Sequence, residues 1–223
     1  MVVANSTPAT SRRTGAEPGA GSVSALLFDL GNVLIDIDFD RSFSHWSEAS
    51  GVPAVELKAR FRAGEDYERH ERGEITVEQW FECLRRDLGL ELDAAAMLAG
   101  WNALLLEEIV GIRAVIDALD PALPRYVFSN TNAAHHACFA PRHKALLDRF
   151  EKVFLSNALG ARKPEPVAFE KVLAQIGCPA GEILFFDDNR ANVEGARAVG
   201  LQAVQVSSVA DVADALSKRG LLG

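Results

Sequence analysis

Cysteine is scarce in this sequence, and its placement excludes two common ways of stabilising a small fold. The 223 residues contain three cysteines, Cys83, Cys138 and Cys178. They are widely separated and odd in number, so neither a zinc-binding spacing nor a disulfide framework can be read from them. We therefore expect reduced, structural thiols, which are typical of a cytoplasmic protein.

Long apolar runs are absent as well, because no stretch approaches the roughly 20 residues that cross a membrane. The first 22 residues are mostly small or polar and include Arg12-Arg13, but they lack the apolar segment of a secretory signal. We predict that residues 1–22 are a disordered leader outside the fold and that the protein is cytoplasmic.

Basic residues are outnumbered by acidic ones, 23 to 31, which gives a formal net charge of -8. This balance argues against a broad nucleic-acid interface and against an anionic membrane surface as the partner. An anionic substrate would therefore need a local lysine, arginine, helix N-terminus or metal ion. We expect a monomer or a dimer that acts on a small molecule, with no nucleic-acid or membrane partner.

Apolar residues make up 48% of the chain, enough to bury a core, and they occur in short runs separated by amphipathic segments. These runs predict five buried strands, at residues 25–28, 126–128, 153–155, 183–186 and 201–206. Continuous apolar strands that alternate with helices predict an α/β fold in which a Rossmann-like parallel sheet is covered on both faces.

A long, charged and mostly helical stretch separates the first two of these strands. Thr76 and Gln79 form a capping box at the start of one of its helices. Its tryptophans are interpreted as core residues of the insertion, and no strand is predicted in it before Arg125. We therefore predict a small helical cap inserted after the first strand, with these boundaries: residues 38–110 for the cap, and residues 23–37 and 111–223 for the core.

Three of the predicted strands end in acidic or hydroxyl side chains, namely Asp29, Ser129 and Asp187-Asp188. The carboxyl ends of parallel strands meet at one edge of a sheet, where open α/β folds bind ligands. Clustered carboxylates need a compensating cation, and oxygen ligands of this kind suit Mg²⁺. Lys163, just before a helix, could supply a further balancing charge. These groups are the ones that phosphoryl transfer through a covalent carboxylate intermediate requires.

Each of these residues also has a purely structural interpretation. Asp187-Asp188 could cap the following helix, Ser129 could begin a turn, and Lys163 could be a solvated surface charge. Their occurrence in one order at four strand or helix junctions favours a common site.

In that order, the four segments resemble the four motifs of the haloacid dehalogenase-like superfamily of hydrolases. The segments are Phe28-Asp29 with Gly31, Val127–Asn130, Arg162–Glu165 and Phe186–Asn189. Within the superfamily, the chain is most similar to bacterial α-D-glucose-1-phosphate phosphatases, on the evidence of Asp36–Phe39, His70–Ile75, and Ser129–Asn132 with His135. The resemblance implies a Rossmann-like core with a small cap, and a phosphoric monoester hydrolase. Its expected substrate is a sugar phosphate such as α-D-glucose 1-phosphate.

The resemblance also implies a role for each matching residue. Asp29 would attack phosphorus and become an aspartyl phosphate. Ser129, Asn130 and Lys163 would hold the phosphoryl oxygens as charge redistributes. The implied ligands of Mg²⁺ are Asp29, Asp187, Asp188 and the backbone carbonyl of Gly31.

Gly31 departs from the common superfamily pattern, which has a second aspartate at this position as general acid and base. The carbonyl ligand is retained, but the proton donor is not. General acid–base assistance is typically worth about 10²–10⁴-fold, so its loss favours esters with better leaving groups. A sugar 1-phosphate fits, because it expels an anomeric oxygen. Possible substitute donors are Asp36, Asp38, His70 and Glu71, although salt bridges would explain them equally well.

Two other interpretations stay open because of Gly31. Metal-free 2-haloacid dehalogenases in the same superfamily also lack the second aspartate. A catalytically weak protein that keeps the fold for binding is the other alternative. The paired carboxylates Asp187-Asp188 speak against the dehalogenase, because without a cation they would destabilise the nucleophile's surroundings.

Overall fold

The structure, a computed structural model, describes residues 22–222. The leader predicted at residues 1–22 therefore lies outside the described residues, except for its last position. Among the described residues, no helix combines the length and the apolar character that a membrane span requires.

Five parallel strands form the central sheet, in the order β5-β4-β1-β6-β7. They are β1 (Ala25–Phe28), β4 (Arg125–Ser129), β5 (Lys152–Leu155), β6 (Ile183–Asp187) and β7 (Gln202–Gln205). The first strand of the chain thus lies in the middle of the sheet, between β4 and β6. The predicted α/β fold with a Rossmann-like parallel sheet is confirmed.

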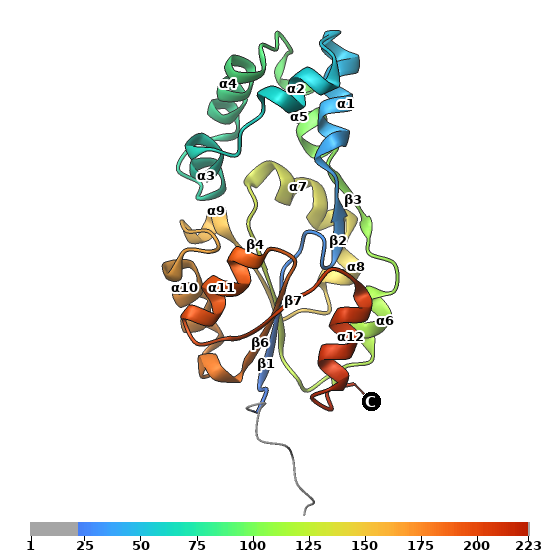
Figure 1. The fold of residues 1–223 in the computed structure, drawn as a ribbon, viewed down its shortest axis with the longest axis vertical. Coiled ribbons are helices and arrows are strands. Elements are labelled where there is room, and N and C mark those ends of the chain that lie inside the picture. Colours follow the sequence, from blue (N-terminus) through green and yellow to red (C-terminus); the bar gives the residue numbers. More distant parts are fainter. Residues whose placement is uncertain (1–21, 223) are drawn as a thin grey trace, which may run out of the picture.

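Helices cover both faces of this sheet, as Figure 1 shows. Side chains alternate along β1, so Leu26 and Phe28 pack into one hydrophobic cluster and Leu27 packs into another. The Leu27 face is covered by α10 (Pro166–Ile176) and α11 (Arg190–Ala198). The opposite face is covered by α6 (Ile112–Asp117), α7 (Ala133–Arg142), α8 (Lys144–Leu147) and α12 (Val209–Ser217). Two short elements complete the core, α9 (Ser156–Leu159) and the 3₁₀ helix η1 (Ala180–Glu182).

Five further helices form a separate group beyond the carboxyl edge of the sheet (Figure 1). They are α1 (Phe39–Ser50), α2 (Ala54–Arg60), α3 (Glu65–Glu71), α4 (Val77–Leu88) and α5 (Ala94–Asn102), and we call them the cap helices. Their centre is aromatic. Trp101 stacks against Trp46 with ring centroids 6.3 Å apart and lies 5.4 Å from Trp80. All three tryptophans are buried, as expected for core residues of the insertion.

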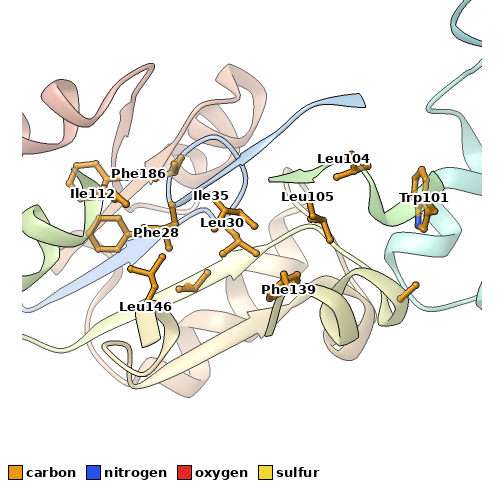
Figure 2. Close-up of a cluster of buried hydrophobic side chains, with 14 of the residues drawn as sticks. Phe28, Leu30, Ile35, Trp101, Leu104, Leu105, Ile112, Phe139, Leu146 and Phe186 are labelled. Carbon is orange, nitrogen blue, oxygen red and sulfur yellow. The ribbon is translucent and has the colours of Figure 1, made fainter. Parts of the chain in front are cut away.

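A small antiparallel pair, β2 (Ile35–Ile37) and β3 (Leu105–Glu108), joins the cap helices to the core. The prediction that no strand lies between the first strand and Arg125 is therefore wrong. β3 has only four residues and ends in two glutamates, which are depleted in strands, so its local pattern carries little strand signal. It forms because β2 pairs with it and because Leu105 packs into the large hydrophobic cluster, which reaches from the sheet to Trp101 (Figure 2).

Candidate active site

The four predicted segments converge at the carboxyl edge of the sheet. Asp29 directly follows β1, Ser129 ends β4, Asp187 ends β6, and Lys163 lies in the loop before α10. A cavity of about 240 Å³ opens between this edge and the cap helices. The cavity lining includes these predicted site residues: Asp29, Gly31, Ser129, Asn130, Lys163 and Asp188. Asp187 is fully buried behind them.

Lys163 is a buried cation at the centre of this arrangement, with 1% of its surface exposed. Its Nζ lies 2.7 Å from Asp29 Oδ1 and 2.7 Å from Asp187 Oδ2, and it donates a third hydrogen bond to the Phe128 carbonyl at 2.8 Å. Burial by itself would lower the pKa of Lys163, but the carboxylates of Asp187 and Asp29 outweigh burial and raise it. The ammonium group therefore stays charged at neutral pH.

Three carboxylates surround that one cation. Asp29, Asp187 and Asp188 each offer an oxygen within 4.8 Å of the others. Burial raises the pKa of Asp29 to about 7, against the attraction of Lys163, and the neighbouring carboxylates add to the rise. Burial also raises the pKa of Asp188. The cluster is therefore short of positive charge, and an oxygen-only donor set of this kind suits Mg²⁺.

Two asparagines that the sequence analysis did not single out hold the acidic residues in place. Asn192, on the first turn of α11, donates from Nδ2 to both carboxylate oxygens of Asp187 at 3.1 Å. Asn32 donates to Asp188 Oδ2 at 3.1 Å. Asn32 also has a φ of 55°, a left-handed conformation that asparagine tolerates better than most residues. Only the fold brings these amides to their acceptors.

Asn130, expected to contact phosphate, is also bound to the backbone of Lys163. Its Nδ2 donates to the Lys163 carbonyl at 2.8 Å, and the Lys163 amide donates to its Oδ1 at 2.8 Å. This reciprocal pair fixes the loop after α9 against the end of β4. The structure therefore gives Asn130 a part in positioning Lys163, in addition to its place in the cavity wall.

An apolar side chain lies beside Gly31, where the superfamily pattern has a proton donor. A Cβ atom added to Gly31 would lie 3.0 Å from Cδ1 of Ile37. Both residues line the cavity. An acidic side chain at position 31 would therefore require the flexible end of the Ile37 side chain to shift by a few tenths of an ångström.

The cap helices contribute an ion-paired carboxylate to the same cavity. Glu71, at the end of α3, is 5% exposed and accepts a hydrogen bond from Arg162 Nε at 2.7 Å. Arg162 also pairs with Glu68 at 3.2 Å, and Arg72 pairs with Glu165 at 2.6 Å. These pairs tie α3 to the loop that carries Lys163. The other suggested substitute donors lie outside the cavity lining: Asp36, Asp38 and His70.

Two buried histidines lie where the cap helices meet the core. His135 Nε2 lies 3.0 Å from the Trp101 carbonyl, and its Nδ1 lies 3.0 Å from Asn132 Nδ2. Because a carbonyl can only accept, we assign the proton to Nε2. Nδ1 then accepts a hydrogen bond from the Asn132 amide, so the imidazole is neutral. Burial lowers the pKa of His135 to about 3 and the pKa of His70 to about 4.

We expect these histidines to make folding stability depend on pH. In the unfolded chain, each imidazole regains a pKa near about 6.5, so the unfolded state binds more protons between about pH 4 and 6.5. The free energy of unfolding then has its highest value above about pH 6.5. At lower pH it decreases, by about 2 kcal/mol per histidine at pH 5. Urea denaturation at a series of pH values measures this. His135→Gln should flatten the dependence, whereas His136→Gln, at an exposed position on the same helix, should not. An equal slope in both variants would contradict the assignment.

Comparison with known proteins gives one family. The family model described as haloacid dehalogenase-like hydrolase matches residues 23–200. A D-ribitol-5-phosphate phosphatase from Bacteroides thetaiotaomicron is 26% identical over 191 residues, which cover 83% of this chain and 93% of that protein. A phosphatase from Mycobacterium tuberculosis is 28% identical over 192 residues, which cover 83% and 88% of the two chains.

A solved structure has the same architecture. The magnesium complex of a HAD-family enzyme from Bacteroides thetaiotaomicron superposes with a TM-score of 0.72 at 26% identity. The match covers 84% of this chain and 95% of that one.

Proposed function

We propose that this chain, which belongs to the haloacid dehalogenase-like hydrolase family, is a Mg²⁺-dependent phosphomonoesterase acting on a sugar phosphate, foremost α-D-glucose 1-phosphate. The observation that carries the proposal is the buried Lys163 held between Asp29 and Asp187 beneath the cap helices. Relatives named as phosphatases support the reaction, and a relative solved with magnesium supports the metal. The resemblance to α-D-glucose-1-phosphate phosphatases supports the substrate.

The residues of the cluster divide the chemistry between them. Asp29 attacks phosphorus, the ester oxygen leaves, and water later releases phosphate from the acyl phosphate formed on Asp29. Lys163 holds the nucleophile in place, and together with the hydroxyl of Ser129 it stabilises charge on the phosphoryl oxygens. The donor set that fits Mg²⁺ is Asp29, Asp187, Asp188 and the Gly31 carbonyl. When bound there, the ion offsets the repulsion between the carboxylate nucleophile and the phosphate.

The cavity volume and the glycine at position 31 restrict the range of expected substrates. A volume of about 240 Å³ suits a small metabolite, since pockets for drug-sized ligands run from about 300 to 1,000 Å³. With Ile37 against Gly31, no side chain at position 31 protonates the leaving oxygen. An anomeric oxygen leaves more readily than a primary alkoxide. The proposal therefore ranks sugar 1-phosphates above phosphates of primary hydroxyls.

We further propose that residues 38–110 act as a cap over the core formed by residues 23–37 and 111–223. The ion pair between Glu71 and Arg162 and the contact of His135 with Trp101 join the two parts beside the cavity. Side chains of the cap would then meet the sugar, while the core holds the phosphate.

Phosphate release from three esters, with MgCl₂ and with EDTA, tests the proposal. The esters are α-D-glucose 1-phosphate, D-glucose 6-phosphate and D-ribitol 5-phosphate. We expect kcat/KM to be highest for the 1-phosphate and activity to be lost in EDTA. A preference for either primary ester would overturn the leaving-group argument. Halide release from a 2-haloacid in EDTA would favour the dehalogenase alternative. No release from any ester would favour a binding protein.

A further inference from the structure

Three ionisable side chains of the cavity lining, Asp188, Glu71 and His135, are hydrogen-bonded to a neighbour. Asp188 accepts from Asn32, and Glu71 accepts from Arg162. Both ring nitrogens of His135 are hydrogen-bonded. Asp29 itself is the proposed nucleophile. Beside Gly31, where a general base would act on water, the structure places the apolar side chain of Ile37.

This arrangement affects the two halves of the reaction differently. In the first half of the reaction, in which Asp29 is phosphorylated, a good leaving group compensates for the missing acid. The loss of rate in this step therefore depends on the substrate. In the second half, in which phosphate is released from Asp29, the attacking molecule is water for every substrate. No substrate can therefore compensate for the missing base in this step. General-base assistance is typically worth about 10²–10⁴-fold. For esters with good leaving groups, release of phosphate from Asp29 therefore becomes the slow step.

Part of the cavity wall is apolar and suits a sugar ring as the attacking molecule. Ile37, Phe39 and Leu104 line the cavity next to the polar cluster. They offer an apolar surface to the C–H face of a sugar. A bound hydroxyl also gains from proximity, which water free in the cavity does not.

We propose that phosphorylated Asp29 accumulates during turnover and that its phosphoryl group passes to the anomeric hydroxyl of a second sugar, so that the chain is a phosphotransferase as well as a phosphatase. This inference rests on the proposed function. The acceptor oxygen bonds to phosphorus, the bond from phosphorus to Asp29 Oδ breaks, the carboxylate is restored, and the hydroxyl proton goes to solvent. A site that expels an anomeric oxygen without an acid also accepts one without a base, because each step is the reverse of the other.

Stopped-flow kinetics with p-nitrophenyl phosphate and Mg²⁺ test the proposal, because nitrophenolate leaves without protonation. We expect a burst of about one nitrophenolate per active site, followed by a slower steady rate. Added D-glucose should accelerate the steady rate and raise the ratio of nitrophenolate to phosphate above one, with glucose 1-phosphate as the second product. Methyl α-D-glucoside, which lacks the free anomeric hydroxyl, is the matched control. It should change neither the steady rate nor the ratio of nitrophenolate to phosphate.

The outcomes separate this inference from the proposed function. Steady release without a burst, unaffected by glucose, overturns the inference and leaves the phosphatase intact. Equal acceleration by the methyl glucoside overturns the claim that the anomeric hydroxyl is the acceptor. No release of nitrophenolate or phosphate from any ester overturns the proposed function itself. The double substitution Gly31→Asp with Ile37→Ala provides room for a base, and it should abolish the burst by accelerating phosphate release about 10²-fold or more. An unchanged burst in a folded double variant that binds Mg²⁺ would contradict the role of Gly31 and Ile37.

Discussion

Replacing Asp29 by asparagine is expected to reduce kcat by about 10⁴-fold or more, the scale on which loss of a covalent nucleophile acts in other enzymes. Asparagine has nearly the same shape, and its side-chain oxygen can still accept the 2.7 Å hydrogen bond from the Leu30 amide. An amide oxygen, however, is far too weak a nucleophile to attack phosphorus. Phosphate release from α-D-glucose 1-phosphate measures the effect.

A matched control separates this loss from a general disturbance of the protein. Asp36→Asn removes a carboxylate that is exposed and lies outside the cavity lining. Its kcat/KM should stay within about twofold of the original chain, because most surface substitutions away from special features change little. If the Asp29 variant kept a tenth of the activity, the nucleophile would have to be another residue.

Replacing Lys163 by methionine is expected to lower the free energy of unfolding by about 3–5 kcal/mol when no divalent cation is present. The substitution removes the buried cation that contacts Asp29 and Asp187 at 2.7 Å, and it leaves the Phe128 carbonyl without its donor. Uncompensated buried carboxylates are costly, even though a methionine fills much of the same volume. Urea denaturation in EDTA measures the loss.

Two further measurements connect that loss to charge. Lys152→Met removes an exposed lysine that contacts Gln175 and the ring of Phe154, and it should change stability by less than about 1 kcal/mol. Adding Asp187→Asn to Lys163→Met should restore part of the loss, because one buried negative charge disappears with it. A loss below about 1 kcal/mol for Lys163→Met alone would show that the carboxylates do not need this cation.

Mg²⁺ should stabilise the Lys163 variant, since a ligand that binds only the folded state adds RT ln(1 + [L]/Kd). At a concentration of about 100 Kd this amounts to about 2.7 kcal/mol. The same increase should be absent from Asp188→Asn if that carboxylate is a ligand. A midpoint of urea denaturation that Mg²⁺ does not move would argue against the cluster as the metal site.

Much of the fold was predictable because local patterns decide it. The run Ile183–Phe186 is apolar throughout and is followed by Asp187-Asp188, which is typical of a buried parallel strand that ends at a ligand edge. The same reasoning placed Asp29 and Ser129 at strand ends, and the structure brings these side chains to one cavity. The superfamily expected from the four motifs is confirmed by the family match. The domain boundaries, the metal ligands and the catalytic roles stay predictions.

The sequence alone pointed to the residues that we propose for the chemistry: an aspartate after the first strand, a lysine before a helix, a pair of aspartates, and a glycine where the superfamily pattern has a proton donor. Residue type and residue order can be read from the sequence without knowing which distant segments come into contact. Only the tertiary structure decided how the residues are held. Four contacts show this: the pairing of β2 with β3, the hydrogen bonds between Asn130 and the Lys163 backbone, the hydrogen bond from Asn192 to Asp187, and the approach of Ile37 to Gly31. Each of them joins groups from different segments of the chain. Such contacts carry no local pattern, because their energy comes from packing and hydrogen bonding between segments that meet only after folding.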